Sequence, residues 1–131
     1  MRKLAMLLAL TVSASATAKS PFLGTWKKTA GEASVVIKFK EKEVSFKINV
    51  EGATIEAVGN YGVTKENVIF GIITKLKQDD TGQAPGKGTL FSFQLSLTTK
   101  KGDKFKLSKL TPAEGDEKAL VEGVYTKVKG K

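Results

Sequence analysis

The sequence has 131 residues, a formal net charge of +9, a single Trp, and neither Cys nor His. Without Cys and His the chain has no disulfide, no thiol nucleophile, no Ser-His-Asp triad and no zinc site with the usual ligands. Nearly all of its 13 Asp and Glu residues fall in turns or on the outward faces of the strands described below. Neither burial nor like-charge pairing would tune such carboxylates for acid–base catalysis, so we expect no enzyme, no cofactor and no metal site.

The first 18 residues have the organisation of a secretory signal peptide. Arg2 and Lys3 give a positive start, residues 4–12 are apolar, and residues 16–18 (Ala-Thr-Ala) match a cleavage site. This apolar segment is too short to span a bilayer, which takes about 17–25 residues. We therefore predict cleavage after Ala18 and export to the periplasm or the medium. The remaining domain, 19–131, would carry a net charge of +7.

From residue 23 on, apolar and polar residues alternate with the period of two that is typical of half-buried β-strands. Short gaps rich in Gly, Asp and Pro separate eight such segments, so neighbours in sequence should pair antiparallel. The predicted strands are 23–29, 33–40, 43–51, 54–63, 67–77, 88–99, 104–110 and 120–129. Because closure leaves no strand edge exposed, we predict an all-β, eight-stranded antiparallel up-and-down meander barrel.

Two short helical turns are expected outside the strands. Ser20-Pro21 would begin one turn before the first strand, with Ser as N-cap and Pro at the first helical position. Residues 111–114 resemble a capping box, but Gly115 follows at once, so we expect one turn only. For the last strand, two inward sets remain open, namely Val124/Thr126/Val128 and Gly123/Tyr125.

The barrel interior is the candidate ligand site. Strand parity places six of the seven Phe residues inside, at positions Phe39, Phe46, Phe70, Phe91, Phe93 and Phe105. The candidate ligand-binding residues are Phe46, Tyr61, Phe70, Phe91, Phe93 and Phe105. Eight-stranded barrels are either just filled by side chains or hold one small ligand, and both alternatives stay open here.

The predicted strand 67–77 is apolar on both faces in its first half. With Val68, Phe70 and Ile72 inside, Ile69 and Ile73 would lie outside. We expect these two Ile residues either to be covered by another segment or to form a patch suited to self-association.

The most specific motif is Gly24-Thr25-Trp26 at the start of the first predicted strand. This Gly-x-Trp motif, together with residues 120–129, resembles the lipocalin and avidin barrel superfamily. The chain is more similar still to uncharacterised exported lipocalin-like families of bacteria. The resemblance implies a barrel in which Trp26 closes one end, with Lys127 or Lys129 where lipocalins commonly stack an Arg. It implies no particular ligand, because avidin-type biotin sites need several Trp residues.

Lys residues suggest a second surface. Lys38, Lys40 and Lys47 should face outward on one side of the barrel seam, and Lys104 and Lys106 on the other. Lys27 or Lys28 would extend this basic face across the seam between the first and last strands. The domain after residue 18 has no Arg, so the face should not read nucleic acid sequence, although diffuse attraction to polyanions remains. An ordinary solvated surface is the alternative.

The sequence thus predicts an exported, non-catalytic barrel protein that either holds a small apolar ligand or simply serves as a scaffold for its loops. Two alternatives remain, namely a cell-envelope protein that binds anionic polymers through its Lys-rich face, and an inhibitor of a secreted enzyme that acts through loop 78–88. Within that loop, residues 82–89 lack the spacing and the following helix of a phosphate-binding loop.

Overall fold

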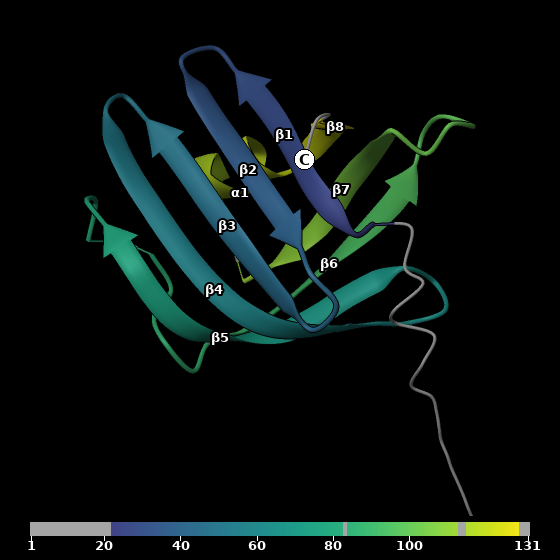
Figure 1. Ribbon diagram of the computed structural model, residues 1–131. Coiled ribbons are helices and arrows are strands. Elements are labelled where there is room, and N and C mark those ends of the chain that lie inside the picture. The colour runs from purple at the N-terminus through teal and green to yellow at the C-terminus, as the bar shows by residue number, and fades with distance from the viewer. Residues whose placement is uncertain (1–21, 83, 113–114, 129–131) are drawn as a thin grey trace, which may run out of the picture.

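The computed structural model describes residues 22–82, 84–112 and 115–128. They form a closed barrel whose strands follow in chain order, each antiparallel to the next, with β8 returning to β1 (Figure 1). This confirms the predicted meander barrel. The elements are β1 Gly24–Ala30, β2 Ala33–Phe39, β3 Glu43–Val50, β4 Ala53–Val63, β5 Val68–Asp79, β6 Leu90–Leu97, β7 Lys104–Thr111, α1 Gly115–Val121 and β8 Gly123–Lys127.

The predicted leader, 1–18, and the turn at Ser20-Pro21 lie outside the described residues. Across the described ranges, no helix is long and apolar enough to cross a membrane.

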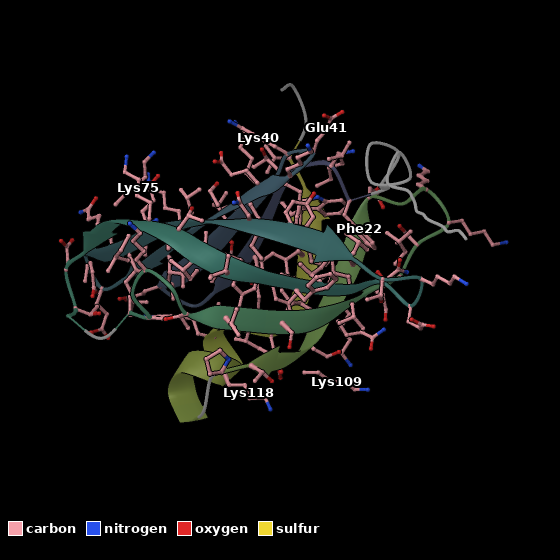
Figure 2. The ribbon with its side chains drawn as sticks, turned by 90° about the horizontal axis from the view of Figure 1, so that it is seen from below. Phe22, Lys40, Glu41, Lys75, Lys109 and Lys118 are labelled. Atoms are coloured by element: carbon pink, nitrogen blue, oxygen red, sulfur yellow. The ribbon has the colours of Figure 1, made fainter. Side chains whose placement is uncertain are left out.

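Aromatic side chains fill the end of the barrel at which β1 begins. Trp26 is fully buried, and its Nε1 donates a 2.9 Å hydrogen bond to the carbonyl oxygen of Phe22. The Trp26 and Phe105 ring centroids lie 4.4 Å apart, and Figure 2 places Phe22 at this end of the barrel. Lys127 Nζ lies 5.7 Å from the centroid of the Trp26 ring. The predicted place of Trp26 is confirmed, and among the described residues of the final strand Lys127 is the cation beside it, whereas Lys129 lies outside them.

The inward set of the last strand is Gly123/Tyr125. Tyr125 is fully buried, its ring stacks on Phe105 at 5.2 Å, and its hydroxyl donates a 2.6 Å hydrogen bond to the carbonyl oxygen of Val121. Val124 faces outward instead. Burial of the phenol raises the pKa of Tyr125.

Helix α1 corrects the prediction for the segment between β7 and β8. The sequence predicted one turn at 111–114 and a strand from residue 120, but the helix begins at Gly115 and runs to Val121. Its carboxyl end is held from a distant strand, because Lys28 Nζ donates a 2.7 Å hydrogen bond to the carbonyl oxygen of Leu120. A cation at this end of a helix also suits the helix dipole.

The predicted parity of β5 is wrong. Ile69 and Ile73 are buried in the core, whereas Phe70 and Ile72 point outward. Gly71 takes the inward position between the two Ile residues, where an added Cβ would collide with the Asn60 carbonyl oxygen and the Phe91 ring. The barrel wall is therefore tightest here, with room inside for a Gly but not for the side chains that the sequence pattern placed inward.

Candidate functional site

An apolar cavity of about 90 Å³ lies at the end of the barrel opposite Trp26. Its inner wall is built by inward residues of β2 to β6, because alternate residues of each strand face the interior. Its mouth is built by the loop before β6, the end of β7 and the last residue of α1. The wall residues include Val35, Phe46, Ile48, Ile55, Ala57, Ile73, Phe91 and Phe93, and the mouth residues include Ala84, Pro85, Leu110, Pro112 and Val121.

Three predicted site residues come together at this cavity. The ring centroid of Phe46 lies 5.5 Å from that of Phe91 and 6.1 Å from that of Phe93, with both pairs edge to face. Phe91 and Phe93 are stacked at 6.1 Å. These rings form an apolar floor beneath the mouth. The rings do not fill this end of the barrel, and the cross-strand neighbour of Phe46 in the cavity wall is only an Ala, Ala57.

The other three predicted residues do not line the cavity. Phe105 belongs to the closed end beside Trp26. Tyr61 packs on Phe39 with ring centroids 5.4 Å apart, and its hydroxyl donates to the carbonyl oxygen of Lys40. Phe70 is wrong as an interior residue, because its side chain is 51% exposed. Its ring covers the outer side of Gly62, where an added Cβ would come within 2.8 Å of it.

Asp79 fastens one side of the mouth. Its Oδ1 accepts hydrogen bonds from the backbone N–H of Thr81 and Gly82 and from the Thr81 hydroxyl, at 3.1, 2.9 and 2.8 Å. Its Oδ2 accepts from the N–H of Ala84 at 3.1 Å, which places Ala84 at the cavity rim. The Thr81 hydroxyl is the largest cause that lowers the pKa of Asp79. The loop is thus folded toward the mouth, whereas an inhibitory loop would be expected to project from the barrel.

A bulge in β7 shapes the other side of the mouth. The pairing of β6 with β7 shifts between Ser92 and Gln94, and Lys109 takes a positive φ of 57°. Lys109 points away from the barrel in Figure 2, and Leu110 lines the cavity in its place. The freed N–H of Leu110 donates a 2.9 Å hydrogen bond to Glu122 Oε2. Glu122 also lies 3.9 Å from Lys118 Nζ.

Sequence reasoning missed the whole mouth. Ala84 and Pro85 lie in a segment that reads only as a loop, and Val121 lies on the helix that was predicted as strand. Leu110 carried a usable signal, because Leu107 and Leu110 break the period of two and so indicate a bulge between them. No comparable signal marked Pro112.

The cavity carries no titratable side chain among its lining residues. The groups with shifted pKa values lie elsewhere. Burial and the nearby Glu41 raise the pKa of Tyr61, and a hydrogen bond from Thr99 lowers the pKa of Asp103. The described residues also contain no cluster of acids that could hold a metal ion. The arrangement can sequester an apolar group, but its wall supplies no acid, base or nucleophile with a shifted pKa.

Self-association through Ile69 and Ile73 is wrong as predicted, because both side chains lie in the core. The outward apolar residues of this region are Phe70, Ile72 and Leu90, which are 51%, 38% and 71% exposed. Ile72 and Leu90 are direct cross-strand partners. An apolar patch therefore exists on β5 and β6, but it is built from other residues than expected.

The five predicted residues of the basic face are all exposed. Lys38 and Lys40 lie on the edge of a polar groove with Glu43 and Glu56, and Lys47 pairs across strands with Glu56. Lys104 and Lys106 face outward on β7, opposite Thr126 and Val124 of β8. Glu43 and Glu56 dilute the positive charge on the β3–β4 side, and Asp103 lies beside Lys104 on the β7 side.

Comparison with protein-family models, with curated proteins and with solved structures finds no match for this chain. The functional proposal therefore depends on the sequence and on the geometry of the cavity.

Proposed function

We propose that this chain is an exported, non-catalytic, lipocalin-like binding protein that takes a small apolar molecule, or one end of an apolar chain, into its barrel. The observation that carries the proposal is the cavity walled by Phe46, Phe91 and Phe93 at one end of a barrel that Trp26 seals at the other. Such a site has one mouth, so the ligand enters past Ala84 and Leu110.

The size of the cavity limits the ligand. Pockets for drug-sized molecules enclose about 300–1,000 Å³. An apolar cavity of about 150 Å³ suffices to bind benzene. The cavity here, at about 90 Å³, suits a group of a few carbon atoms. A longer ligand would leave its remainder outside, beside the hydroxyls of Thr89 and Thr111 at the mouth.

Export is supported by the sequence alone. Arg2 and Lys3, the apolar residues 4–12 and the small residues 16–18 follow the order of a signal peptide. Intact-mass analysis of protein secreted by the native host should find a chain that begins at Lys19. A retained Met1 on the exported protein would contradict this part of the proposal.

The binding proposal is tested with benzene and with straight-chain alkanols of increasing length. Methyl NMR signals of Val35, Ile73 and Val121 should shift on titration, because these side chains line the cavity. The methyl groups of Val124, outside the barrel, should not shift. Affinity should rise with chain length until the inserted end fills the cavity and then level off.

Ala57→Leu supplies the matched variant, because it adds three carbon atoms to the cavity wall. Binding should be lost, while overpacking costs about 1–3 kcal/mol of stability. Ala30→Leu adds the same atoms at an exposed position and should bind like the parent. Shifts that survive in Ala57→Leu, with the fold intact by circular dichroism, would place the ligand elsewhere and overturn the proposal.

A further inference from the structure

The four consecutive strands β7, β8, β1 and β2 contain seven Lys residues and no Asp or Glu. Two of these Lys residues have internal partners, since Lys28 bonds the end of α1 and Lys127 lies over Trp26. The other five face outward, namely Lys27, Lys38, Lys104, Lys106 and, at the β7 bulge, Lys109. None of them belongs to either ion pair found within the described residues.

Strand register places several of these cations on one line across the seam. Lys104 of β7 lies opposite Thr126 of β8, and Thr126 lies opposite Lys27 of β1. The same line continues through Val36 of β2 to Lys47 of β3. Neighbouring strands are about 4.8 Å apart, so Lys104, Lys27 and Lys47 follow one another at intervals of about 10 Å. The first acid on this line is Glu56 of β4.

A groove of about 470 Å³ lies along the seam between β1 and β8. Lys27 and Thr29 form one side, and Val124, Thr126 and Val128 the other. The groove thus combines ammonium groups, two hydroxyls and apolar surface, and it lies on the outside of the barrel, apart from the cavity.

We propose that this seam surface, defined by Lys27, Lys38, Lys47, Lys104 and Lys106, binds a linear acidic polysaccharide. Charge complementarity selects the partner, because the row Lys104, Lys27 and Lys47, which meets no acid before Glu56, attracts a chain of sulfates, phosphates or carboxylates. Lys contributes point charges without the bidentate geometry of Arg, so recognition follows charge density and spacing.

The same surface fits other polyanions less well. The outward faces of β7, β8, β1 and β2 contain no exposed aromatic side chain on which bases could stack, and no Arg to read base edges. A membrane would favour protruding apolar side chains. Here Val124 and Val128, although 49% and 38% exposed, line a groove whose other side is Lys27 and Thr29. A flexible chain can lie in a groove that a bilayer cannot enter.

The test uses heparin as the probe, with the full folded protein. Binding should weaken steeply with NaCl, because each neutralised anionic group releases a counterion. The triple variant Lys27→Gln/Lys47→Gln/Lys104→Gln should reduce the magnitude of the slope of log K against log salt by about 2 to 3, if each contact contributes about 0.7 to 0.9.

The matched control is Lys65→Gln/Lys75→Gln/Lys87→Gln, which removes the same charge from exposed positions outside the seam surface. Its slope should stay close to that of the parent. Equal losses in the two triple variants would show that net charge alone matters and would overturn the proposal. Tighter binding to oligo(dT), or to phosphatidylcholine vesicles that contain phosphatidylglycerol, than to heparin would also overturn it.

Discussion

Lys28 and Leu120, 92 positions apart, join the first strand to the helix beside the cavity mouth through one hydrogen bond of 2.7 Å. The Lys28 stem lies where a Cβ on Gly123 would stand, with Cε only 2.6 Å away. Gly123 also has a φ of +136°, which L-residues rarely adopt. The turn from α1 into β8 therefore depends on a Gly and on a Lys from the other end of the chain.

Lys28→Met should reduce the free energy of unfolding by about 1 kcal/mol, because it keeps the stem but removes the donor to Leu120. Urea unfolding followed by circular dichroism measures the loss. Lys27→Met, on the outward face of the same strand, is the control and should change little. Parent-like stability of Lys28→Met would mean that water replaces the amino group at no cost.

Trp26→Ala should cost about 3–5 kcal/mol, because it empties the closed end around Phe22 and Phe105. Trp26→Phe should cost much less, since most of the apolar volume remains. The only Trp of the chain reports on itself, so its emission should be blue-shifted in the folded protein and move red on unfolding. A Trp26→Ala variant as stable as the parent would show that the indole does not contribute to the core.

Tyr125→Phe should change the alkaline limit of stability. The folded state keeps the phenol protonated above its ordinary pKa of 10.0, so it holds a proton that the unfolded chain has already lost. This contribution is complete below pH 10 and declines as the pH rises above it. The parent should lose stability between pH 9 and about 11.5 faster than Tyr125→Phe does, measured by urea unfolding at each pH. The pH dependence of Tyr61→Phe is compared with it, because burial also raises the pKa of the Tyr61 phenol.

Lys109→Gly should stabilise the protein by up to about 1 kcal/mol, because it relieves the positive φ at the β7 bulge. Lys106→Gly removes the same side chain from the same strand at an ordinary extended position, where Gly should be destabilising. Thermal unfolding of the two variants compares them directly. Destabilisation of both to the same degree would indicate that the bulge stores no strain.

Asp79→Ala should loosen the mouth loop without disturbing the barrel. It removes the acceptor for the N–H groups of Thr81, Gly82 and Ala84, so proteases should cut residues 80–88 faster and alkanols should exchange faster with the cavity. Because the folded state lowers the pKa of Asp79, the loop should stay fastened as the pH falls to 3.8 and loosen only below it. Proteolysis rates unchanged in Asp79→Ala would show that the loop is held by other contacts.

The alternation of apolar and polar residues predicted the strands because successive side chains of a strand face opposite sides of the sheet. This alternation depends on the strand itself and not on distant residues. It failed where the choice depends on distant groups. Gly71 is confined by the Asn60 carbonyl and the Phe91 ring, a crowding that the sequence does not show, and its neighbour Phe70 faces outward. Helix α1 likewise ends at a carbonyl that Lys28 holds. The cavity floor was predictable from strand parity. Its mouth is made of loop and bulge residues, whose sequence has no apolar–polar periodicity.

Within the described residues, the ladder between β1 and β8 pairs Trp26 with Lys127 and Lys27 with Thr126, and the Val128 N–H extends it with a hydrogen bond to the Thr25 carbonyl oxygen. Each links residues about 100 positions apart, so the ladder that closes the barrel has the highest contact order of the fold and the greatest loop-closure cost. During synthesis β1 emerges before β8, so this ladder cannot form until residues 123–127 have been made. We therefore expect closure to be the final step of folding, completed only when the C-terminal strand is free, and the amides of this ladder to exchange before those of β3 and β4.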